Sequence, residues 1–146
     1  YNTEAYFKEE ITMKKVTNLL YWAIMAVLAF WFAYSKGWIL ANFDSINAKT
    51  AIHLIDNDDN VTILDVRTIP EFKEGHLENA TLIPLDSLES NLDKLNASKR
   101  KKVLVYCHSG NRSIAASRIL EGHGFTPVNI KGGIIELAQN GAHIVK

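Results

Sequence analysis

Apolar and polar positions divide the chain into two regions. Residues 16–35, VTNLLYWAIMAVLAFWFAYS, contain no charged side chain. A helix of about 20 such residues spans the hydrocarbon core of a bilayer, because each residue adds about 1.5 Å. Beyond Asn42, short apolar runs alternate with stretches of helical spacing. The pattern predicts an N-terminal segment, residues 1–41, with one transmembrane helix, followed by one folded domain, residues 42–146.

The flanks of the apolar segment fit a spanning helix. Aromatic side chains lie near both ends, as in the aromatic belts of membrane helices: Tyr21 and Trp22 at one end, and Trp31, Tyr34 and Trp38 toward the other. The segment has no polar face, which argues against an interfacial helix. A domain of about 100 residues could not enclose a helix that is apolar all round, so a buried core helix is disfavoured as well.

Two further questions concern processing and orientation. The lysines at positions 14 and 15 and the sequence Ala33-Tyr-Ser35 also resemble parts of a cleaved signal peptide, but the apolar run exceeds the roughly 7–15 residues typical of one. We therefore expect an uncleaved, single-pass anchor. Slightly more lysines precede the span than follow it. By the positive-inside rule, the domain is predicted on the outer, periplasmic side of a bacterial inner membrane.

The domain itself has the pattern of an α/β protein. Unbroken apolar runs suit strands that are buried on both faces, as in a parallel sheet; they cover residues 61–65, 80–83, 102–106 and 127–130. Predicted helices run from a cap at Ser45 or Asn47 to residue 55, over 87–95 with Asp86 and Glu89 as a capping box, over 112–122 and over 134–140. Alternating strands and helices predict a central, mostly parallel sheet flanked by helices.

Composition narrows the possible chemistry. Sixteen basic and sixteen acidic residues balance, so no overall field favours nucleic acid, and none is expected as a partner. The single cysteine, Cys107, can form neither an intramolecular disulfide nor a Cys-x-x-Cys site. It is either a buried apolar residue or a nucleophile. Since His53, His123 and His143 have no metal-ligand spacing, no metal or other cofactor is expected.

The surroundings of Cys107 favour the nucleophile. A predicted buried strand ends at this residue, a short loop follows, and a helix begins near Arg112. Ligands of open α/β sheets bind at the carboxyl ends of strands, where loop amides and a helix N-terminus attract anions. A thiolate is stabilised in such a place and by a nearby cation. The loop from His108 through Ser109, Gly110 and Asn111 to Arg112 is therefore the candidate binding site, with Cys107 as the candidate catalytic residue.

Three motifs, in order, resemble the rhodanese family. Cys107-His-Ser-Gly-Asn-Arg112 is similar to its Cys-x-x-Gly-x-Arg loop; Leu64-Asp-Val-Arg67, with Pro70-Glu-Phe72 and Gly75-His-Leu-Glu-Asn-Ala80, resembles an upstream signature; Val128 to Ile134 resembles the closing element. The resemblance implies a rhodanese fold over about residues 45–146, a persulfide on Cys107, a thiosulfate-like donor, and cyanide, a thiol or a protein as acceptor. The family often has a tryptophan shortly after the Gly-Gly pair, where this chain has Glu136-Leu137.

Of two alternatives to a sulfurtransferase, the sequence disfavours a phosphatase and leaves a persulfide carrier open. Related phosphatases use a longer loop between Cys and Arg, so the four intervening residues here disfavour phosphate as a substrate. A membrane-tethered persulfide carrier, which delivers sulfur to a partner protein without turning over small donors, stays open. Turnover measured together with sulfur loading would discriminate the two.

Several other residues have candidate supporting roles. Asp65 and Arg67 lie at the end of a predicted strand, near the site; we expect Arg67 to pair with Asp65 or Glu71, or alternatively the charges of both residues to shape the pocket. Ser113 is expected near the helix start, with a hydrogen bond to the loop. His76 is interpreted as a hydrogen-bonded structural residue, and His108 as lining the mouth or assisting proton transfer.

Overall fold

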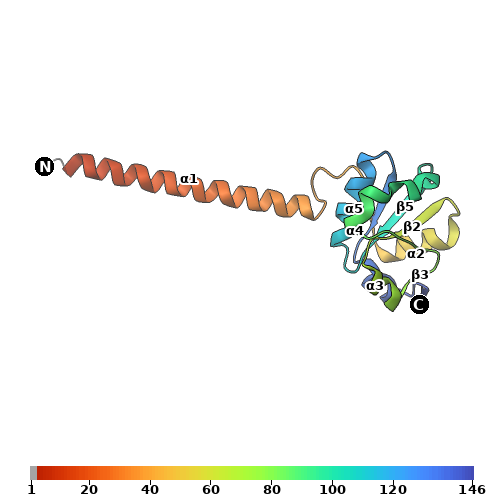
Figure 1. The fold of residues 1–146 in the computed structure, drawn as a ribbon. Coiled ribbons are helices and arrows are strands. Elements are labelled where there is room, and N and C mark those ends of the chain that lie inside the picture. Colours follow the sequence, from red (N-terminus) through yellow and green to blue (C-terminus); the bar gives the residue numbers. More distant parts are fainter. Residues whose placement is uncertain (1–2) are drawn as a thin grey trace. The chain divides into compact units, whose positions relative to one another are not determined.

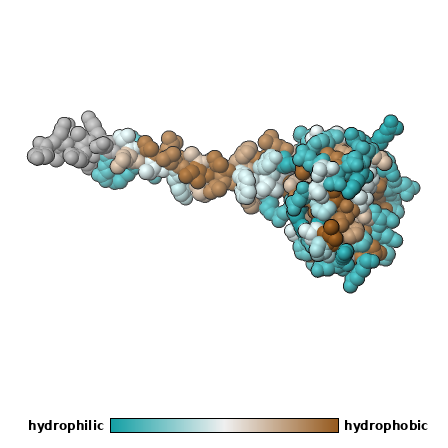
Figure 2. All heavy atoms as spheres, in the orientation of Figure 1, coloured by the Kyte–Doolittle hydropathy of each residue, from teal (hydrophilic) through white to brown (hydrophobic). Residues whose placement is uncertain are grey.

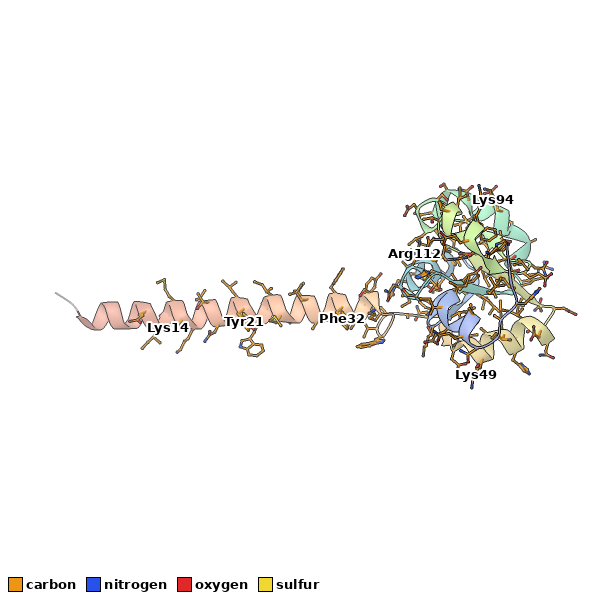
Figure 3. All side chains as sticks on the ribbon, turned by 90° about the horizontal axis from the view of Figure 1, so that it is seen from below. Lys14, Tyr21, Phe32, Lys49, Lys94 and Arg112 are labelled. Carbon is orange, nitrogen blue, oxygen red and sulfur yellow. The ribbon has the colours of Figure 1, made fainter. Side chains whose placement is uncertain are left out.

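The N-terminal region is one continuous helix. The computed structural model describes residues 3–146, with side chains from residue 10 onward, so residues 1 and 2 of the predicted N-terminal segment lie outside it. Helix α1 runs over Thr3–Ser35. Within it, Glu10–Ser35 has a mean hydropathy of 1.8 and is long and apolar enough to cross a membrane. Its side chains project on all sides, Leu19 being 70% exposed (Figure 3). The apolar helix predicted over 16–35 is confirmed as a candidate membrane span.

Two compact units, residues 1–39 and 40–146, make up the structure. The second is built on a five-stranded sheet in the order β1-β6-β5-β2-β4, and each strand pair in it is parallel. The strands are β1 (Asp44–Ile46), β2 (Val61–Asp65), β4 (Thr81–Leu82), β5 (Lys102–Tyr106) and β6 (Thr126–Ile130). The predicted mostly parallel sheet flanked by helices is confirmed (Figure 1).

Helices cover both faces of this sheet. Alternate residues of each strand point to opposite faces, so Val103 and Val105 of β5 pack with one cluster and Leu104 and Tyr106 with the other. The first face is covered by α4 (Leu85–Leu88), the 3-10 helix η1 (Glu89–Ser98) and α5 (Asn111–Gly122), and the second by α2 (Ala48–Asn57) and α6 (Gly133–Gln139). The brown apolar surface of α1 in Figure 2 contrasts with the mostly teal surface of the domain.

Helix starts show where local prediction succeeded and failed. Asn47 caps α2, its side chain accepting from the Thr50 amide at 2.9 Å, which decides between the two predicted caps. The predicted capping box of Asp86 and Glu89 is wrong. Pro84, with φ of −53°, occupies the N-cap position of α4. Asp86 therefore already lies in the first helical turn, where its side chain makes no capping hydrogen bond.

Four short elements were not predicted, and three of them lie between β2 and the chain's end. They are β1, α3 (Ile69–Glu74), β3 (His76–Leu77) and β7 (Ile144–Val145). Helix α3 begins with a full capping box, in which Thr68 and Glu71 exchange hydrogen bonds. Strands β3 and β7 form a two-stranded antiparallel sheet. This small sheet fixes the chain just after α6 to the segment just after α3.

Candidate active site

Cys107 follows β5 directly, at the carboxyl end of a central strand of the sheet. The chain turns at Gly110, whose φ of +95° favours glycine, and α5 begins at the next residue. The Gly110 amide donates to the Cys107 Sγ at 3.1 Å. The Ser113 Oγ, in the first turn of α5, lies 3.7 Å from the same sulfur. The loop therefore brings an amide, a hydroxyl and a helix N-terminus to one thiol.

The buried Cys107 sulfur has polar neighbours, unlike a cysteine that only packs in an apolar core. Cys107 is 1% exposed and packs with a core cluster that includes Leu64 and Ala116. A thiol buried among aliphatic side chains alone would behave as a small apolar residue. Here the Gly110 amide and the fully buried Ser113 hydroxyl are polar neighbours on one side of it. That side can stabilise negative charge on sulfur, while the aliphatic side excludes water.

The N-terminus of α6 holds the outer side of the cysteine loop. The Ile134 amide donates to the Cys107 carbonyl at 2.8 Å, and the Ile135 amide donates to the His108 carbonyl at 3.4 Å. Gly133, with φ of +57°, allows this approach: a Cβ there would lie 2.5 Å from the His108 carbonyl oxygen and closer still to that of Cys107. The second glycine of the Gly-Gly pair is thus required by backbone contact with the loop.

Arg112 is joined to Glu71, a residue of α3. Its Nη1 and Nη2 donate to the two Glu71 carboxylate oxygens at 2.8 and 2.6 Å. This bond to Arg112 holds the pKa of Glu71 well below its usual value, aided by hydrogen bonds from Thr68, and the same pairing raises the pKa of Arg112. The guanidinium of Arg112, labelled in Figure 3, stays protonated and forms an ion pair with the Glu71 carboxylate. The cation expected beside the thiol is therefore largely balanced.

Asp65 and Arg67 form a buried ion pair at the end of β2. Arg67 Nη2 and Nε donate to the Asp65 carboxylate at 2.7 and 3.0 Å, and Nη2 and Nη1 also donate to the carbonyls of Gly75 and Glu71. Burial lowers the pKa of Arg67, but its bonds to Asp65 outweigh this and raise the pKa overall. The structure places this pair as predicted for a structural role, tying the end of β2 to α3.

The exposed loop residues and the histidines have distinct settings. His108, Ser109 and Asn111 are exposed, and His108 lines a groove of about 350 Å³ beside the loop. His76 stacks on Phe72 with ring centroids 3.6 Å apart, and its Nδ1 lies 2.9 Å from the Phe72 carbonyl oxygen. That setting agrees with the structural interpretation of His76. A larger cavity, about 480 Å³, lies against α2 and the first residues of β2 and includes no residue of the cysteine loop.

The departure at Glu136 and Leu137 affects the core more than the site. Leu137 is fully buried against the α2 face of the sheet, and Glu136 is exposed. Neither lines the groove, to which α6 contributes Ile134, Ile135 and Ala138 instead. Aliphatic side chains therefore form the helix wall beside the loop.

Glu71 and Gly133 are the site residues whose contacts sequence reasoning missed. The Pro-Glu-Phe motif was noted, yet the pairing of its glutamate with Arg112 joins positions 41 residues apart, and no local pattern reports such a contact. The capping box of Thr68 and Glu71 follows the Thr-x-x-Glu spacing and could have been found from the sequence.

A comparison with protein families identifies the domain that carries this cysteine loop. Residues 47–140 match the family described as rhodanese-like domain. The chain belongs to this family. The matched residues include every strand of the parallel sheet except β1, together with the whole loop from Cys107 to Arg112.

Similar rhodanese-like proteins include solved structures and curated relatives. The rhodanese-like domain protein of Staphylococcus aureus is 32% identical with a TM-score of 0.63, covering 71% of this chain and 100% of that one. A rhodanese-related protein of Thermoplasma volcanium is 35% identical with a TM-score of 0.63, covering 70% and 98%. The tRNA uridine(34) hydroxylase of Escherichia coli is 39% identical over 108 residues, covering 67% of this chain. The match spans 31% of that enzyme, so its name describes a much longer protein.

Proposed function

We propose that this rhodanese-like domain is a sulfurtransferase that carries sulfane sulfur as a persulfide on Cys107. One observation carries the proposal: a lone thiol at the end of a buried strand faces the Gly110 amide at 3.1 Å, at the N-terminus of α5. Helix N-termini and oriented amides stabilise thiolates and anions. The rhodanese-like fold supports the same chemistry. No cofactor takes part in the proposed reaction.

The first half of the reaction loads the protein. The Cys107 thiolate attacks the outer sulfur of thiosulfate, a bond forms between Sγ and that sulfur, and the bond to the sulfite group breaks. Sulfite leaves with the bonding electron pair, and the negative charge of the thiolate passes to the outer sulfur of the persulfide. The Gly110 amide already donates to Sγ, and we expect the amides of the loop from His108 to Arg112 to stabilise the charge on the outer sulfur, as preorganised donors do for a developing anion.

The second half unloads it. Cyanide in the assay, or a thiol in the cell, attacks the outer sulfur, and the bond to Sγ breaks with its electron pair returning to Cys107. Thiocyanate or a new persulfide leaves, and the thiolate is regenerated. A thiolate on Cys107 is a better leaving group when the Gly110 amide and the Ser113 hydroxyl stabilise it. The same contacts therefore serve both halves.

Intact-mass measurement after exposure to thiosulfate tests the proposal. The full chain should gain the mass of one sulfur atom, lose it again with cyanide, and release thiocyanate. Cys107→Ser should neither gain mass nor turn over. Ser90→Ala, at an exposed serine of η1 outside the cysteine loop, is the matched control and should still load. Loading of Cys107→Ser, or none in the natural chain, would refute the assignment.

A persulfide carrier is the second candidate, favoured by the burial of the sulfur. Cys107 is 1% exposed, so a persulfide formed there is shielded from bulk thiols. A carrier would load one sulfur atom and hold it, with negligible thiosulfate-to-cyanide turnover. A transferase would release thiocyanate repeatedly. The same mass experiment, followed over time, separates the two.

We also propose a single-pass membrane protein with the domain on the periplasmic side. Support comes from the apolar helix Glu10–Ser35 and from Lys14 and Lys15 before its most apolar part. Protease added to spheroplasts should degrade the domain while a cytoplasmic marker survives. Protection of the domain until the membrane is broken would reverse the orientation.

A further inference from the structure

An open groove beside the cysteine loop has a mostly aliphatic wall. Its volume is about 350 Å³. Helix α6 and strand β7 supply the aliphatic side, and the segment around α3 supplies the polar side, with His108 between them. The lining residues on the aliphatic side are Ile134, Ile135, Ala138 and Ile144, and those on the polar side are Arg67, Glu71, Glu74 and Gly75.

One of the exposed large apolar side chains of the domain lines this groove. Among the described residues from 40 onward, the large apolar side chains that are exposed are Leu40, Ile69 and Ile135. Ile135, 41% exposed, lines the groove. Ile69, 54% exposed, begins α3, the helix that carries Glu71 to Arg112. Apolar surface that adjoins a groove, in a domain that buries most of its aliphatic residues, is typical of a contact site.

Charge in the groove is unevenly balanced. Arg67 is neutralised by Asp65, and Glu71 by Arg112. Glu74 is exposed and has no ion pair within the part of the chain that the structure describes. The remaining formal charge is negative, which favours an occupant with a basic side chain beside apolar ones.

The groove adjoins the cysteine loop, where the proposed sulfur transfer takes place. Cys107 is 1% exposed, while His108, the next residue, lines the groove. An acceptor that reaches this sulfur past the exposed His108 would have its neighbouring residues along the groove. We propose that the groove docks the sulfur acceptor, a polypeptide segment with a thiol flanked by aliphatic and basic side chains. This inference rests on the proposed sulfur transfer and names the class of acceptor for it.

Two synthetic peptides test the inference on the full chain in lipid nanodiscs. One has the sequence Lys-Leu-Cys-Leu-Lys and the other Glu-Ser-Cys-Ser-Glu. After loading with thiosulfate, the first peptide should accept sulfur about tenfold faster than the second, because aliphatic burial and charge both favour it. The rate of sulfur transfer to each peptide is read from the gain in the peptide's mass. Dividing it by the rate of transfer to cyanide in the same protein variant gives the transfer ratio for that peptide.

Substitutions in the groove should lower this ratio for the first peptide. Ile135→Ser should reduce it by about fivefold, through lost aliphatic contact, and Glu74→Gln by about twofold, with added salt reducing the preference as well. Matched controls are Leu40→Ser, at another exposed apolar residue, and Glu121→Gln, at an exposed glutamate of α5. Both controls should leave the ratio unchanged. Equal rates for the two peptides, or an unchanged ratio in both groove variants, would overturn the docking site.

A binding measurement keeps this result separate from the proposed chemistry. A fluorescent peptide, Lys-Leu-Ser-Leu-Lys, cannot accept sulfur, so its anisotropy with unloaded protein reports docking alone. Binding that weakens in Ile135→Ser supports the groove even if thiosulfate fails to load Cys107, which would instead refute the transferase. Normal loading with no preference between the peptides would refute the groove and leave the transferase standing.

Discussion

Replacing Gly133 by alanine should damage the cysteine loop from outside the site. The new Cβ would lie 2.5 Å from the His108 carbonyl oxygen, and both nearest groups are backbone. Nonbonded carbon contacts are most favourable at about 3.5–4.0 Å, so α6 and the loop must separate by roughly 1 Å. Neither the loop backbone nor the start of α6 can rotate away as a flexible side chain could.

The cost can be added up from its parts. A non-glycine residue in the left-handed region costs about 1–2 kcal/mol. Separation also breaks the bonds from Ile134 and Ile135 to the carbonyls of Cys107 and His108, at about 0.5–1.5 kcal/mol each. Alanine recovers about 0.4–1 kcal/mol by restricting the unfolded chain. The free energy of unfolding should fall by about 1–5 kcal/mol, with a central value of about 3, a large share of the roughly 5–15 kcal/mol of an ordinary domain.

Urea unfolding of the full chain in detergent measures this loss, and Gly124→Ala is the matched control. Gly124 has a similarly positive φ of +80°, but a Cβ there would meet nothing within 4 Å. It should therefore lose only about 1 kcal/mol. Gly133→Ala should also load sulfur more slowly than the control. Equal destabilisation of the two variants would show that the close contact between Gly133 and the loop backbone does not affect the free energy of unfolding.

Three other substitutions probe contacts around the site. Tyr106→Phe removes the hydroxyl that accepts from the Leu77 amide at 3.1 Å, so a buried donor is left unpaired and urea unfolding should show a loss of about 1–3 kcal/mol. Asp65→Asn leaves the buried Arg67 charge uncompensated and should cost about 3–5 kcal/mol, measured as a lowered midpoint of unfolding. Because the folded-state pKa of Glu71 is depressed, its stabilisation is full above pH 4.5 and is lost as the pH falls below it. Glu71→Gln should therefore be about 1 kcal/mol less stable at pH 7, with the gap narrowing in acid; a constant gap would contradict this.

Much of the fold could be predicted because its signals are local. The apolar runs 61–65 and 102–106 became β2 and β5 with the same bounds, since continuous β-branched and aliphatic residues suit a strand buried on both faces. Short elements such as β3 and β7 were not predicted. Two residues give too little periodicity to detect, and these strands exist because each pairs with the other across a long stretch of chain.

The site was predictable only as far as it is continuous in sequence. The order strand, cysteine, glycine and arginine placed Cys107 at a strand end and Gly110 in the turn, as the structure has them. The partner of Arg112 was not predicted, because a long-range ion pair leaves no spacing to recognise. As a result, the sequence suggested a free cation beside the thiol, whereas the structure pairs that cation with Glu71.

The support that α6 gives to the loop has a consequence for the order of assembly. During synthesis, Cys107 leaves the ribosome before residues 133–139, whose amides fix the carbonyls of Cys107 and His108. Until β6 and α6 are in place, the thiol lies on an incomplete sheet, open to oxidants and to foreign thiols. A nascent chain therefore passes through a stage in which the thiol is exposed, and this stage ends only when α6 docks.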